Sequence, residues 1–357
     1  MASLVPTLAP APYRRHRRHA SRGDHVWVTA HTAATLAELG DAAAADRWGP
    51  GVLVRLGSAL ARRQELTAAR TELTRALDAL DGSLAASDLG GGEVAGLQLV
   101  EVLAALGEFG EARRRALALW DSRRHATTRA GAARLLASVH LAGGDLSGAH
   151  AWLDEAAARA AALGGDLPLA LVHADRAVVV TTDGRVGEGV AMATEALERL
   201  SRVTASSRAA VWADAQASTT ACAVALGAAL AGDLGAAGTL GAVATERAVT
   251  DHRPLDAAWR HVLASALLRL SGEPVRAAAY ADAATLAFGA AGAEPGRAAA
   301  VREQALVAMA TGRHASAVAL ARDARAAFTR LGMPLEAGRT DAFAVAFAMG
   351  DNEPHGP

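Results

Sequence analysis

A pattern of small residues recurs along this chain at intervals close to 40 residues. Each occurrence is a pair of small residues seven positions apart on a stretch of helix-forming sequence. The pairs are Ala69/Ala76, Ala149/Ala156, Gly189/Ala196, Ala237/Ala244, Ala277/Ala284 and Ala317/Ala324, and one further unit departs from the rule with Ala112 and Leu119. Seven residues span about two turns of α-helix, so both small side chains face the same way and let a second helix approach closely. The pattern predicts a succession of tightly packed helix pairs.

Glycines stand at a fixed place in this pattern, five positions before the first small residue of nearly every unit. They are Gly107, Gly144, Gly184, Gly232, Gly272 and Gly312, and the first unit carries Gln64 instead. Glycine adopts the positive φ that ends many helices, which other residues resist. Each unit is therefore expected to be two antiparallel helices joined by a short turn. Ser207 to Ala231 is expected to form one long helix, and Gly90–Gly92 a linker.

The composition supports helix throughout. Of 357 residues 95 are alanine, and lysine and isoleucine are absent, a bias that a GC-rich genome produces. Ala, Leu, Arg and Glu favour helices, whereas the β-branched and aromatic residues that build sheets are scarce. An alanine-rich helical bundle without repeats is the alternative, but glycines in register favour a repeat array.

The unit Leu53, Leu56, Gly57, Leu60, Ala69, Leu73, Ala76 resembles the tetratricopeptide repeat (TPR). The period is longer than the roughly 34 residues of that family. In this respect, and in the closing stretch 326–337, the chain is similar to the TPR-like arrays of large bacterial (actinobacterial) transcriptional regulators, without their ATPase or helix-turn-helix modules. The resemblance implies an all-α fold, a right-handed superhelix (α-solenoid) of about seven to eight TPR-like helix pairs. The expected divisions are a flexible basic N-terminal tail at 1–24, one solenoid at 25–350 and a disordered C-terminus at 351–357.

The sequence lacks residues and motifs that several classes of function require. The absence of lysine excludes a phosphate-binding loop that depends on one, and a net charge of -1 gives no basic field for nucleic acid, so direct nucleic-acid binding is not expected. No apolar run is long enough for a membrane span, and the single cysteine, Cys222, fits a cytoplasmic protein without disulfides. No catalytic, cofactor-binding or metal-ligating motif is found, so no such residue is expected and no cofactor is implied.

The TPR resemblance implies a binding groove on the concave side, lined by the first helix of each pair. In this register six residues are expected to contact a ligand: Glu101, Arg134, Thr181, Trp259, Arg269 and Arg302. Guanidinium groups suit carboxylates, and a tryptophan suits a peptide anchor. The alternative interpretation is that these arginines only keep an exposed face soluble.

The leading hypothesis is a non-enzymatic scaffold or regulatory module that binds a protein or peptide. An enzyme or small-molecule sensor with a pocket inside the superhelix is the alternative, with His173, Asp175, Arg176 and Cys222 as its residues. A homodimer and a separate DNA-binding subunit stay open. The final helix is expected to pack back on the preceding unit through Phe343 and Phe347, four residues apart on one face.

Overall fold

The computed structural model describes residues 50–81, 91–121, 125–164, 166–202, 207–246 and 253–350. The expected tails at 1–24 and 351–357 lie outside these residues. Within them every regular element is an α-helix, which confirms the all-α prediction. The helices are α2 (Pro50–Arg62), α3 (Leu66–Asp81), α4 (Gly91–Leu106), α5 (Phe109–Asp121), α6 (Ala126–Ala142), α7 (Leu146–Leu163), α8 (Asp166–Thr182), α9 (Val186–Ser201), α10 (Ser207–Leu230), α11 (Leu234–Glu246), α12 (Pro254–Leu270), α13 (Pro274–Ala291), α14 (Glu294–Ala310), α15 (His314–Arg330) and α16 (Pro334–Gly350).

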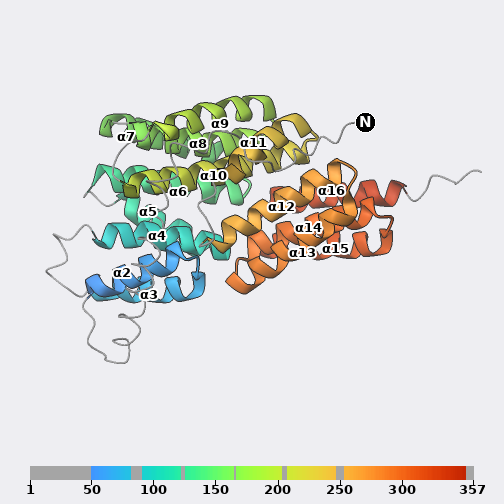
Figure 1. The fold of residues 1–357 in the computed structure, drawn as a ribbon. Helices are drawn as coiled ribbons and strands as arrows, with labels where there is room; N and C mark the ends of the chain where they lie inside the picture. The colour runs from blue at the N-terminus through green and yellow to red at the C-terminus, as the bar shows by residue number, and fades with distance from the viewer. Residues whose placement is uncertain are drawn as a thin grey trace, which may run out of the picture.

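Successive helices pack as pairs, α2 with α3 through α14 with α15, and each pair also packs on the next (Figure 1). The small residues lie where these helices touch. Ala69, Ala76, Ala277 and Ala284 are completely buried, as the seven-residue spacing predicts. A Cβ added to Gly57 would lie 2.7 Å from Cγ of Leu73 on the partner helix, so the two backbones are as close as small residues allow.

The turn glycines have the predicted conformation. Gly107, Gly144, Gly184, Gly232, Gly272 and Gly312 all have positive φ, between 73° and 87°. Gln64, which stands at the same place in the first unit, also has a positive φ, of 60°. The long helix expected from Ser207 is α10. The expected linker at Gly90–Gly92 is wrong in part, because α4 already begins at Gly91.

The later helices return to the turns of the early units. The backbone N–H of Leu255 donates to Oε1 of Gln64 at 2.6 Å, across 191 residues of sequence. A Cβ on Gly107 would lie 3.4 Å from Pro295, and one on Gly144 would lie 2.8 Å from Pro334. Each of these three contacts joins residues about 190 positions apart, which is nearly five units. The array therefore curves so far that its later helices contact the turns of its early units. Figure 1 shows α12–α16 as a second stack beside the earlier helices.

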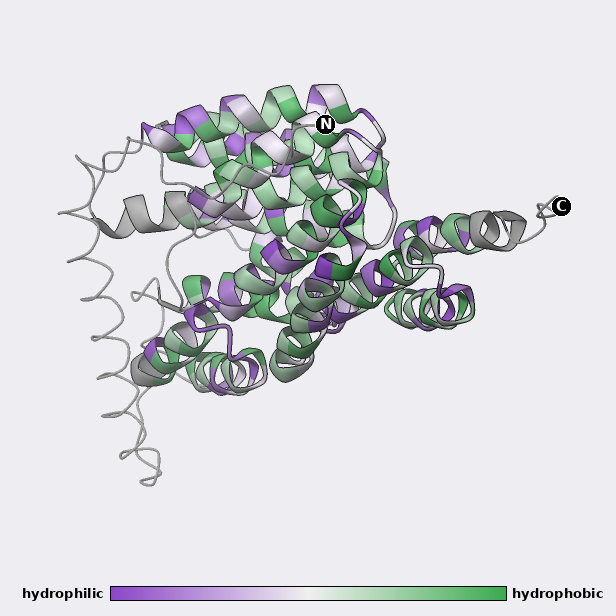
Figure 2. Cartoon of the chain, turned by 45° about the vertical axis from the view of Figure 1, so that its right-hand side comes forward, coloured by the Kyte–Doolittle hydropathy of each residue, from purple (hydrophilic) through white to green (hydrophobic). Residues whose placement is uncertain are grey.

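The largest cluster of buried residues includes residues from both the early helices and the later helices that contact them. It contains Leu99 and Leu136 from α4 and α6 together with Leu255 and Val262 from α12. At the end of the array Phe343 packs against buried residues of α14 and α15, as predicted, whereas the side chain of Phe347 lies outside what the structure describes. Hydrophobic and hydrophilic residues alternate along the helices in Figure 2, and no described helix is long and apolar enough to cross a membrane.

Candidate functional site

The three arginines expected in the groove are already paired with carboxylates of the protein. Arg134 Nε lies 2.6 Å from Asp175 Oδ2, and Arg269 Nε lies 2.8 Å from Glu303 Oε1. Arg302 pairs with Glu336, and its guanidinium carbon lies 5.3 Å from the centre of the Phe328 ring.

Each of these ion pairs joins the first helix of one unit to the first helix of the next: α6 to α8, α12 to α14 and α14 to α16. The Arg269–Glu303 pair is the most enclosed, with side chains 13% and 4% exposed. These arginines therefore hold neighbouring units together. The ion pairs show what these arginines bind within the protein, and their contact with a ligand stays a prediction.

Two further expected groove residues serve the interior packing. The Trp259 ring packs edge-on against Phe288, with ring centres 4.9 Å apart, and it touches three separate buried clusters. Thr181 is 5% exposed and its hydroxyl donates to the carbonyl of Ala177 at 2.7 Å. In this conformation Thr181 offers almost no surface to a ligand.

Glu101 on α4 differs from all of these, because it has no hydrogen bond or ion pair with the described residues. Its side chain is exposed to solvent. Burial by the surrounding protein nevertheless raises the pKa of this carboxyl, against the opposing effects of Arg134 and Arg253.

Glu101, Arg134, Asp175 and Gln216 form a polar row across four consecutive first helices, α4, α6, α8 and α10. The charges of Arg134 and Asp175 both act on the pKa of Glu101, and Arg134 and Asp175 form an ion pair. Sequence analysis predicted Glu101 and Arg134 but missed Gln216. Its spacing was a usable signal, because Arg134 and Asp175 are 41 residues apart and Gln216 follows Asp175 by the same interval.

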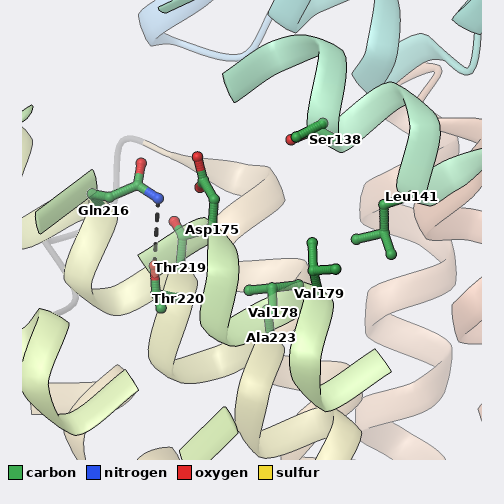
Figure 3. Close-up of a pocket in the computed structure, with 10 residues that line it drawn as sticks. Ser138, Leu141, Asp175, Val178, Val179, Gln216, Thr219, Thr220 and Ala223 are labelled. Atoms are coloured by element: carbon green, nitrogen blue, oxygen red, sulfur yellow. Dashed lines mark hydrogen bonds between the residues drawn. The ribbon is translucent and has the colours of Figure 1, made fainter. Parts of the chain in front are cut away.

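A pocket of about 190 Å³ opens beside Asp175, between α6, α8 and α10 (Figure 3). Its floor is apolar and includes Ala137, Val178, Val179 and Ala223. Its rim carries hydrogen-bonding side chains from all three helices: Ser138, Asp175, Gln216, Thr219 and Thr220.

The hydrogen bonds of the rim leave groups free for a ligand. Gln216 Nε2 donates to Thr220 Oγ1 at 3.4 Å, whereas no described residue is bonded to Gln216 Oε1. Asp175 uses Oδ2 for Arg134, and no residue in the described part of the chain is bonded to its Oδ1. The rim can therefore accept hydrogen bonds from backbone N–H groups or from cationic groups.

The four residues considered for catalysis do not converge. His173 Nδ1 lies 3.8 Å from Glu195 of α9, and burial lowers the pKa of the imidazole. Arg176 instead pairs with Asp154 of α7, while Asp175 pairs with Arg134. Burial raises the pKa of the Cys222 thiol to about 12, so the reactive thiolate is not formed near neutral pH. No group of three or more metal-ligating side chains occurs among the residues that the structure describes.

Comparison with models of known protein families finds no match for this chain, and neither does comparison with curated proteins.

Proposed function

We propose that this chain is a TPR-like adaptor, a right-handed superhelix of about seven to eight helix pairs, that binds an extended segment of a protein partner. The binding face consists of the first helices α4, α6, α8 and α10. The partner segment crosses these helices along the polar row and places one apolar side chain in the pocket.

The pocket between α6, α8 and α10 carries this proposal. It combines an apolar floor with free hydrogen-bond acceptors on the rim, which is the combination that holds a peptide side chain and its backbone N–H groups. Within the neighbouring row Arg134 and Asp175 neutralise each other, whereas Glu101 has no ion-pair partner among the described residues. A partner segment can therefore lie along the row without burying two opposed charges that lack partners.

The size of the pocket favours a side chain over a metabolite. Pockets that enclose a drug-sized ligand usually measure about 300–1,000 Å³. The pocket here measures about 190 Å³, which suits one or two peptide side chains. With the dispersed positions of His173, Arg176 and Cys222, this volume makes binding of a polypeptide the better supported function.

Filling the pocket tests the proposal. Ser138 is exposed on the pocket rim, so Ser138→Trp should occupy the pocket without disturbing the packing of α6. Ser316, exposed on α15, offers the matched control Ser316→Trp far from this face in the sequence. Partners captured by the full chain with a photo-crosslinker would be compared among the three proteins, with circular dichroism to confirm equal folding.

The expected result is loss of the captured partner with Ser138→Trp and retention with Ser316→Trp. Equal capture by both folded variants would refute a binding site in this pocket.

A further inference from the structure

His140 is a titratable side chain at a place where the other units have a buried apolar residue. This place lies four positions before the turn residue of each unit. The other units have Leu60, Leu103, Val180, Ala228, Leu268 and Ala308 there, and all of these are buried. The third helix pair therefore has an imidazole where the rest of the array has hydrocarbon.

The imidazole of His140 is held by two side chains that follow it in the chain. Its Nδ1 lies 2.8 Å from Oδ2 of Asp145, the N-cap residue of α7. Its Nε2 accepts a hydrogen bond from Nε1 of Trp152, on α7, at 3.2 Å. Gly148 leaves room for this arrangement, because a Cβ there would overlap both His140 Nδ1 and Asp145 Oδ2. The His140 side chain is only 16% exposed, so its nitrogens depend mainly on these two partners.

These two bonds fix the protonation state of the ring. An indole N–H can only donate, so Nε2 must carry a lone pair, and the proton of the neutral imidazole lies on Nδ1 and is donated to Asp145. A second proton, on Nε2, would set two donors against each other and end the bond with Trp152, whereas the bond with Asp145 would persist. Imidazole is the side chain that changes charge between about pH 5 and pH 8. Mild acid therefore breaks one of the two bonds and spares the other.

Asp145 is the charged group that His140 contacts directly. A hydrogen bond from the Gly148 backbone, together with the one from His140, lowers the pKa of Asp145, so this carboxylate stays ionised throughout that pH range. The helices α4, α5 and α8 also pack against α6. Their ionisable groups act on other residues of α6 and its turn: Glu93 on Thr128, Glu101 and Asp175 on Arg134, and Arg113 on Asp145.

The bond to Trp152 joins two helices. Among the described residues it is the one hydrogen bond between a side chain of α6 and a side chain of α7. The Trp152 ring also packs edge-on against Trp120 of α5, with ring centres 5.3 Å apart. Next to His140 on α6, Leu141 lines the pocket described above. Loss of this bond therefore changes the contact between α7 and the helix that forms one wall of the pocket.

We propose that His140 is a pH-dependent switch in the third helix pair, in which protonation of Nε2 by solvent releases the indole of Trp152 from α6. Asp145 retains the charged ring, so the change is confined to the indole and its contacts. The switch belongs to the fold and does not depend on what the pocket binds.

Nuclear magnetic resonance of the indole N–H groups tests the switch directly. The full chain, labelled with nitrogen-15, would be titrated from about pH 8 to about pH 5, the range in which imidazole changes charge. Trp152→Phe identifies the Trp152 signal by its disappearance. His140→Gln supplies an amide oxygen that accepts from Trp152 at every pH, and His150→Gln is the matched control, because His150 is a half-buried histidine of the same helix pair.

In wild type and in His150→Gln the Trp152 signal should move through a single transition toward the position of an indole in water. In His140→Gln it should stay in place over the whole range. A Trp152 signal in wild type that does not move with pH would overturn the inference, and so would a transition that survives in His140→Gln.

A second variant keeps the test decisive if the glutamine variant fails to fold. His140→Leu has the residue that the first unit carries at this place, Leu60, and it offers Trp152 no acceptor. Its Trp152 signal should stand at the acid position of wild type at every pH. A signal at the neutral position of wild type would show that His140 does not bind the indole, which would also overturn the inference.

Discussion

Gln64 joins the first helix pair to the start of α12, and its replacement should show how much this long-range contact stabilises the protein. The residue is buried and has a φ of 60°, a conformation that costs a non-glycine residue about 1 kcal/mol or more. In return its amide accepts from Leu255 N at 2.6 Å and donates to Asp256 Oδ1 at 3.0 Å. A neutral hydrogen bond contributes about 1 kcal/mol to stability and one to a charged group about 1.5–3 kcal/mol.

Two substitutions at this position separate the side chain from the backbone. Gln64→Ala removes both hydrogen bonds and keeps the strained φ, so it should lower the free energy of unfolding by about 2–4 kcal/mol. Gln64→Gly loses the same bonds but relieves the strain, so it should be about 1 kcal/mol more stable than the alanine variant. Gly184→Ala calibrates the strain, because Gly184 has a φ of 87° and open space where its Cβ would lie.

Urea unfolding would be followed by tryptophan fluorescence and circular dichroism together, since repeat arrays unfold in one step only when such probes coincide. Amide hydrogen exchange at Leu255 would report the closure locally, and both variants should expose this amide faster than wild type. A Gln64→Gly protein as stable as wild type, with unchanged exchange at Leu255, would show that the closure contributes nothing and refute the reasoning.

Three other predictions concern single contacts. A Cβ added at Gly227 would lie 2.4 Å from Cγ2 of Thr181, so Gly227→Ala should destabilise the protein by about 1–3 kcal/mol. Adding Thr181→Ser, which removes Cγ2, should restore much of the lost stability in urea unfolding. No recovery in the double variant would contradict the contact. Burial raises the pKa of Glu303 above its ordinary 4.5 despite Arg269. Protonated Glu303 therefore contributes its full stabilisation below pH 4.5, and this stabilisation is lost as pH rises through the raised pKa of the folded state. In Glu303→Gln the free energy of unfolding should therefore decrease less with pH in that range than it does in wild type. The same pH dependence in both proteins would contradict the raised pKa of Glu303. Cys222, whose pKa is raised to about 12, should react with iodoacetamide only after unfolding, as mass spectrometry would show; labelling of the native protein at neutral pH would contradict its burial.

Much of the local structure could be read from the sequence because it depends on neighbours within one unit. Ala69 and Ala76 are seven residues apart on one helix face, and both are buried where that face meets the next helix. Gly184 has the positive φ that its position in the pattern predicts. Such features repeat because each unit meets the same packing requirement.

The candidate site could be predicted only in part. The register predicted Glu101 and Arg134 as groove residues, and in the structure Arg134 forms an ion pair with Asp175. The same register could not show that Arg134 already has a carboxylate partner, because that partner lies one unit later, 41 residues away. Trp259, expected as a peptide anchor, packs edge-on against Phe288 within the protein, and its contact with a peptide stays a prediction.

The sequence by itself determined the helices, their turns and the residues at which paired helices touch, since helical periodicity and the conformational freedom of glycine act over short distances. Only the tertiary structure decided that Gln64 meets the start of α12 and that Gly144 meets Pro334. Those contacts follow from a small rotation at each unit that accumulates over about 190 residues. No local pattern in the sequence contains that accumulated rotation, which also determines which charges on the first helices find partners within the described chain.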